Sequence, residues 1–140
     1  MIISYKLLLY CVVSGGLYLL VLSLLLDLVE RKLRLTAGIP VSMLEADGLI
    51  WSLMNFFMES LFYVVIPAIA YSFFYAILPL SGIKAGMASA LFAFVLGAAP
   101  ALMRMSVRVK LPMPYLLFIM LSHLLKLGGT LSIIAYLYAL

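Results

Sequence analysis

Four long apolar segments separated by short polar stretches dominate this 140-residue chain, at about residues 5–26, 49–78, 83–103 and 114–138. A helix needs about 20 residues to cross roughly 30 Å of hydrocarbon, and each segment reaches that length. The segments lack the sustained apolar–polar alternation of a membrane-spanning strand. The sequence therefore predicts an all-α integral membrane protein with a single four-helix transmembrane domain over residues 1–140.

The composition supports lipid as the solvent of this chain. Hydrophobic residues make up 68% and charged residues 10% of the sequence, whereas soluble domains have about 45–50% and about 25%. One cysteine, Cys11, excludes an intrachain disulfide and a cysteine-rich zinc site. We expect no metal and no cofactor.

The basic residues predict how the chain is oriented. Lys6 and Lys84 lie on one side of the predicted membrane, and two loops on the other side carry most of the remaining positive charge. Cytoplasmic loops are enriched in Lys and Arg, so we expect these loops inside and both termini on the outer face of the cytoplasmic (inner) membrane. Because topology accounts for the charge, we expect no nucleic-acid partner. The basic loop residues are Arg31, Lys32, Arg34, Arg104, Arg108 and Lys110.

The second apolar segment is too long for an upright span. Its 30 residues, 49–78, would extend about 45 Å as a helix. We therefore expect it to tilt or kink, and Pro67 supplies a kink point because proline lacks the N–H of the regular helix ladder. Trp51 near its start is typical of an interfacial anchor.

A faint internal repetition suggests that the spans are arranged as two helical hairpins. Pro40 and Pro112 each follow a basic loop, and Ile-Ala-Tyr occurs at 69–71 and 134–136. The two offsets, 72 and 65 residues, differ. A true repeat would relate the hairpins by an axis along the membrane normal.

Small residues repeat along one face of the third segment. Such residues allow helix backbones to approach closely in a membrane. We expect this face to pack against the other helices of the same chain, with a dimerisation face as the alternative. Its members are Gly82, Gly86, Ser89, Ala93 and Gly97.

Ionisable residues inside apolar spans are the best candidates for a site. Asn55, Glu59, His123 and Lys126 are predicted to form an intramembrane polar cluster, because Glu59 and His123 both lie about nine residues, roughly 13 Å, from the same membrane border. Glu59 and Lys126 would neutralise each other. The cluster suits a structural clasp, a proton or ion path, or a contact with a partner subunit.

The chain contains no recognised catalytic or nucleotide-binding motif, such as a Walker sequence, HExxH or a nucleophile elbow. We therefore expect a non-enzymatic accessory or structural subunit of a larger or homo-oligomeric membrane complex. Its partners would be the lipid bilayer and other membrane subunits or further copies of itself. The alternative is a small proton- or ion-coupled transporter or channel that uses Glu59, His123 and Lys126.

Overall fold

The computed structural model describes residues 5–40 and 48–140, and within them the regular structure is entirely helical. Four helical rods in this part of the chain are long and apolar enough to cross a membrane. Two are continuous helices. They are α1 (Tyr5–Leu33) and α6 (Met113–Ala139).

The other two rods are interrupted by π-helical turns. The second span comprises α2 (Leu49–Ser60), the π turn η2 (Leu61–Val65) and α3 (Ile66–Phe74). The third span comprises α4 (Gly82–Ala93), the π turn η3 (Phe94–Ala98) and α5 (Ala99–Arg108).

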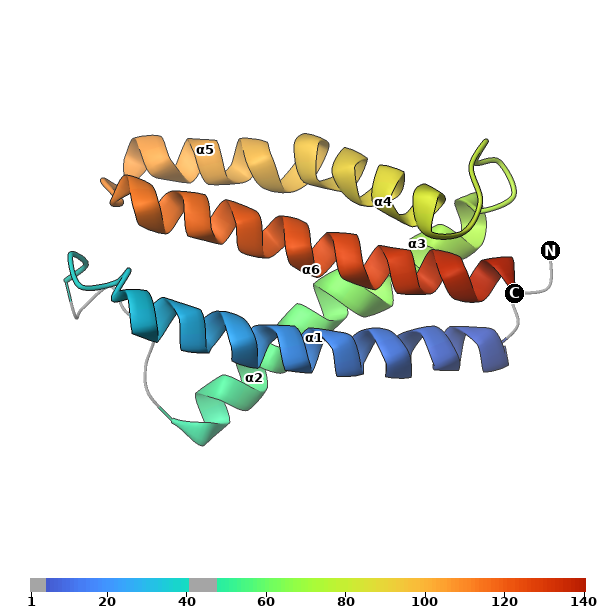
Figure 1. The fold of residues 1–140 in the computed structure, drawn as a ribbon, viewed down its shortest axis with the longest axis horizontal. Coiled ribbons are helices and arrows are strands. Elements are labelled where there is room, and N and C mark those ends of the chain that lie inside the picture. The colour runs from blue at the N-terminus through green and yellow to red at the C-terminus, as the bar shows by residue number, and fades with distance from the viewer. Residues whose placement is uncertain (1–4, 41–47) are drawn as a thin grey trace.

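The spans alternate in direction, so that α1 begins and α6 ends at the same end of the bundle (Figure 1). Residues 34–40, which follow α1, and the 108–113 connection lie at the opposite end, which we call the loop end. The four predicted apolar helices are thus confirmed. Several of their limits were wrong.

The helix limits differ from the sequence prediction in a way that follows helix chemistry. α1 continues past residue 26 through Glu30, Arg31 and Lys32 to Leu33, because these are good helix formers and can reach lipid headgroups. The third span likewise runs beyond residue 103 to Arg108. The second span stops at Phe74, not 78, and the chain then turns before Pro79.

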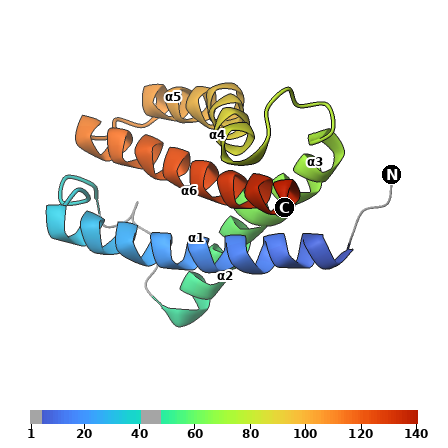
Figure 2. The same ribbon diagram turned by 45° about the vertical axis from the view of Figure 1, so that its right-hand side comes forward.

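α6 is the centre of the bundle. It packs against α1, against the second span and against α4, and the α4–α6 contact is the most extensive in the molecule (Figures 1 and 2). Of the four spans, α6 has the most buried residues, and Thr130 and Ile134 are fully buried. Within the described residues the third span packs on α6 and on no other span.

Glycine makes the α4–α6 contact possible. A Cβ atom added at Gly86 would lie 2.5 Å from the carbonyl oxygen of Leu131 and from the Cα of Ser132. Only a residue without a side chain allows backbones to approach this closely, which is the use of small residues between membrane helices.

The small-residue face of the third span is divided, not continuous. Gly86 is buried against α6, and Gly82 begins α4 beside Ala139. Ser89 is half-buried, whereas Ala93 and Gly97 are exposed. This differs from the expected continuous internal face, because η3 changes the helical register at Phe94 and the span then continues as α5 with little contact to α6.

Both π turns precede a proline by the same spacing. The N–H of Ile66 donates to the carbonyl of Leu61, one residue before Pro67, and the N–H of Ala99 donates to the carbonyl of Phe94, one residue before Pro100. Proline has no N–H to continue the regular ladder, and a wider turn accommodates its ring. Pro67 is thus at the predicted interruption, whereas the equivalent role of Pro100 was not anticipated.

Candidate functional site

An ion pair joins the second span to α6 inside the membrane-spanning region. The Nζ atom of Lys126 lies 2.5 Å from Oε1 of Glu59, and the two side chains are only 12% and 22% exposed. Ser23 of α1 donates a hydrogen bond of 3.1 Å to Oε2 of the same carboxylate. Three spans therefore meet at Glu59, and each of its oxygens has a partner.

An aromatic pair lies beside the ion pair, with Tyr63 one turn after Glu59 and His123 one turn before Lys126. The Tyr63 hydroxyl and Nδ1 of His123 form a hydrogen bond, and their rings stack with centroids 5.6 Å apart. The Lys126 ammonium lies 5.7 Å from the centroid of the Tyr63 ring, within the range of a cation–π interaction. The ion pair and the aromatic pair thus form one layer, here called the polar layer: Ser23, Glu59, Tyr63, His123 and Lys126.

Helical spacing explains why these side chains meet. Glu59 and Tyr63 are four residues apart on the second span, and His123 and Lys126 are three apart on α6, so each pair lies on one helix face. Glu59 and His123 each lie ten residues after the first residue of their span, Leu49 and Met113. At 1.5 Å per residue that is about 15 Å from the loop end, near the middle of the hydrocarbon.

A polar cleft reaches the layer from the loop end. It has a volume of about 530 Å³ between α1 and α2 and is called the vestibule here. Asn55 is exposed and lines this cleft together with Asp27 and Arg31, while Glu59 and Lys126 form its part nearest the membrane centre. Asn55 therefore lies beside the ion pair along the vestibule, and no side-chain hydrogen bond joins it to the other three predicted cluster residues in the described structure.

An apolar groove borders the other side of the layer. It has a volume of about 830 Å³ between the second and third spans, with α6 as its floor, and is called the midplane groove. Tyr63 and His123 lie in its lining, as do Ser89, Ala93 and Gly97 of the small-residue face. Sequence reasoning missed this groove. Pro100 and the small residues could have indicated an interrupted third span, but not a groove beside it.

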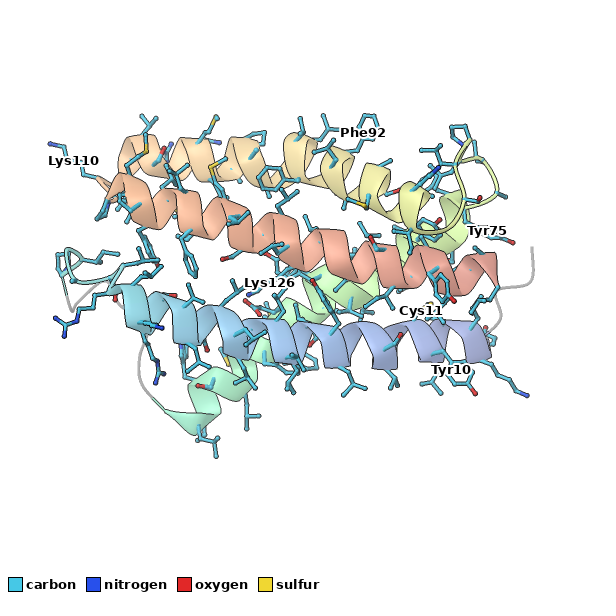
Figure 3. All side chains as sticks on the ribbon, viewed as in Figure 1. Tyr10, Cys11, Tyr75, Phe92, Lys110 and Lys126 are labelled. Carbon is cyan, nitrogen blue, oxygen red and sulfur yellow. The ribbon has the colours of Figure 1, made fainter. Side chains whose placement is uncertain are left out.

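The basic loop residues lie toward the loop end of the bundle. Arg31 and Lys32 lie in the last turn of α1, and Arg108 in the last turn of α5. Lys110 projects from the loop end beyond α5 (Figure 3). Arg34 has a positive φ of 49°, a conformation that helps to turn the chain after α1.

The chemistry available in the polar layer is limited. The ion pair leaves no net charge in the hydrocarbon, which removes most of the cost of burying each charge alone. Among residues 5–40 and 48–140 no group of three His, Cys, Asp or Glu side chains is placed to hold a metal ion. The layer supplies hydrogen-bonding groups at Tyr63, His123 and Glu59. Lys126 is labelled in Figure 3, where it lies between the ribbons of α6 and α1.

Comparison with known proteins gives no relative from which a role can be transferred. No family model, curated protein or solved structure matches this chain. The role of the polar layer and the two clefts must therefore be inferred from their own geometry.

Proposed function

We propose that this protein is a non-enzymatic subunit of a membrane complex, formed with further copies of itself or with other membrane chains. One observation carries the proposal. Among the α-helices of the described residues, α2 alone has no buried residue. A helix so little covered by its own chain has most of its surface free for contacts with a neighbouring chain.

The course of the second span supports the same proposal. It crosses behind α1 and α6 at a steep angle, so that its α2 end diverges from the bundle, whereas its α3 end packs against α6 (Figures 1 and 2). Its α2 portion has no buried residue and exposes Asn55. Polar side chains on a membrane helix are stabilised by contacts with another helix or with water. A partner helix against α2 would provide such contacts.

Mass measurement in mild detergent tests this proposal. The chain has a mass of 15.5 kDa, and we expect native membranes to yield a larger, stoichiometric complex. A lone monomer without companions would contradict the proposal.

Cross-linking locates the contact. In a Cys11→Ser background, Phe57→Cys on the 68% exposed outer side of α2 should cross-link to a neighbouring chain. Leu117→Cys on α6, 60% exposed, is the matched control and should not. Equal cross-linking at both positions would indicate random collision instead of a defined interface.

The orientation is also a proposal, with both termini outside and the loop end in the cytoplasm. It rests on the excess of Lys and Arg at the loop end. In the Cys11→Ser background, Ser81→Cys should react with an impermeant maleimide in intact cells. Ala37→Cys should react only after the membrane is opened. The reverse pattern would invert the topology and exclude the proposed placement.

A second candidate is a proton- or ion-coupled transporter or channel, and the vestibule favours it. A polar cleft that ends at an intramembrane carboxylate is an arrangement expected of an ion path. Glu59→Gln should then abolish proton or ion flux in proteoliposomes, whereas Lys84→Gln, at the other end of the bundle, should not. The absence of any flux from the natural protein under an imposed gradient would remove this candidate.

A further inference from the structure

The midplane groove has the size and the shape of a site for a small amphiphile. Its volume of about 830 Å³ falls within the range of about 300–1,000 Å³ typical of small-molecule sites. The second span supplies one wall with Tyr63 and Ile66, the third span supplies the other with Ala93 and Gly97, and α6 closes the floor. Phe62 and Phe92 border it and are 57% and 69% exposed. The groove is therefore open to lipid.

The charge of the lining restricts the occupant to a neutral molecule. No Asp, Glu, Lys or Arg is among the described residues that line the groove, in contrast to the vestibule. The neighbouring charges of Glu59 and Lys126 neutralise each other. A charged headgroup would find no counter-charge there, and its desolvation would oppose binding.

The depth of His123 restricts the occupant further. His123 lies about 15 Å inside the span, whereas phospholipid headgroups remain at the borders of a hydrocarbon layer roughly 30 Å thick. A molecule whose polar atoms reach His123 must therefore carry an uncharged polar group that enters the hydrocarbon. Phospholipids would present only acyl chains at this depth.

The aromatic pair of the polar layer supplies the polar contact. Nδ1 of His123 is engaged with the Tyr63 hydroxyl, which leaves Nε2 as the ring nitrogen for an occupant of the groove. When the Tyr63 hydroxyl donates to Nδ1, a neutral imidazole carries its proton on Nε2 and donates there. The matching group on the occupant is a carbonyl oxygen.

We propose that the midplane groove binds one lipid of the quinone class, with a ring carbonyl accepting a hydrogen bond from His123 and the isoprenoid tail lying along the apolar walls. Aromatic neighbours suit a flat ring, because offset stacking is favourable beyond the burial of area. The proposal concerns binding alone. It does not depend on the proposed subunit function, because the outer side of α2 with Phe57 lies outside the lining of the groove.

Binding can be measured on the full chain in phosphatidylcholine nanodiscs. The probe is a radiolabelled benzoquinone with a tail of two isoprenoid units, and the comparison molecule is the same tail without the ring. We expect saturable binding of the quinone at one molecule per chain and at least tenfold weaker binding of the bare tail. Equal binding of the two molecules, or no saturable binding, would overturn the proposal.

Variants then assign the site. Ala93→Trp should fill the groove and weaken quinone binding at least tenfold, whereas the matched Leu117→Trp, on a lipid-exposed part of α6, should leave it unchanged. His123→Phe retains a ring but removes the hydrogen bond from Nε2 to the quinone, together with the one from Tyr63 to Nδ1, and should weaken binding about fivefold. Unchanged binding in both Ala93→Trp and His123→Phe would place the quinone elsewhere and contradict the proposal.

The competing occupants are distinguished in the same preparation. Excess phosphatidylglycerol that displaces the quinone would identify a phospholipid acyl site and overturn the proposal. The mass of the complex is recorded alongside. If the protein forms an oligomer that binds no quinone, this inference is rejected and the subunit function is not. If the protein is a monomer that binds quinone, the subunit function is rejected and this inference is not.

Discussion

The continuous spans and the interrupted spans differ in where their surfaces are used. α1 and α6 have no proline within their apolar lengths beyond the first turn of α6, and they run side by side through the bundle. The second and third spans contain Pro67 and Pro100, and each has a π turn directly before the proline. The midplane groove lies between these two interrupted spans. All four spans contribute buried residues, but the two walls of the groove come from the interrupted spans.

The ion pair between the second span and the continuous α6 should have the largest effect on stability when it is broken. Glu59→Leu leaves the Lys126 ammonium without its carboxylate in the hydrocarbon, and we expect a loss of about 3 kcal/mol in the free energy of unfolding. Unfolding in a denaturing detergent followed by circular dichroism measures it.

The double variant Glu59→Leu with Lys126→Leu is the control for the ion pair. It removes both charges, so stability should return to within about 1 kcal/mol of the natural protein. A double variant as unstable as the single one would mean that packing, not charge, holds the second span to α6.

The glycine contact gives the next largest effect. Gly86→Ala places a methyl group 2.5 Å from the backbone of α6, so α4 must move away, and we expect a loss of about 2 kcal/mol. Gly128→Ala, on the continuous α6, meets nothing within 4 Å and should be neutral or slightly stabilising. Thermal unfolding compares the two, and an equal loss in both would exclude backbone approach as the cause.

A smaller effect is expected at the aromatic pair. Tyr63→Phe removes the hydroxyl that bonds to His123 while retaining the ring, and should cost about 1 kcal/mol. Tyr10→Phe on α1 is the matched control, because its side chain is 66% exposed. If both variants unfold like the natural protein, the hydrogen bond contributes nothing net to stability.

Pro100→Ala should change stability least, but it tests the difference between interrupted and continuous spans most directly. It restores an N–H to the third span, and we expect η3 to become α-helical with stability within about 1 kcal/mol of the natural protein. Spin labels at Phe62 and Val107, both exposed, should report a changed distance across the groove. Pro114→Ala, in the first turn of α6 where proline is tolerated, should leave that distance unchanged.

The helical fold could be read from the sequence because apolar length alone specifies it. The meeting of Glu59 with Lys126 could be anticipated because depth and helical spacing agree on both spans. Thr130 shows the limit of that reasoning. It lies four residues after Lys126, on the same face of α6, so helical spacing alone would add it to the polar layer. Its side chain is instead fully buried and donates to carbonyl oxygens of its own helix.

The midplane groove could not be predicted, because it depends on the angle at which the second span crosses α6. Periodicity assigns residues to a face but does not say which neighbour covers that face. The division of the small-residue face between Gly86 and Gly97 depends in turn on η3. Pro100 indicates that the third span is interrupted, as Pro67 does for the second, but a proline does not specify the crossing angle.

The wider turn at η3 also determines the direction in which each side chain of α5 points around the helix axis. A regular helix advances about 100° per residue, since 3.6 residues complete one turn. Deleting one residue from Phe94–Ala98 would therefore rotate α5 by that angle relative to α4. Ala101 and Met105 would no longer face the groove. The guanidinium groups of Arg104 and Arg108 would point in a different direction at the membrane border. Chain length within this single turn thus determines which side of the third span each later residue presents.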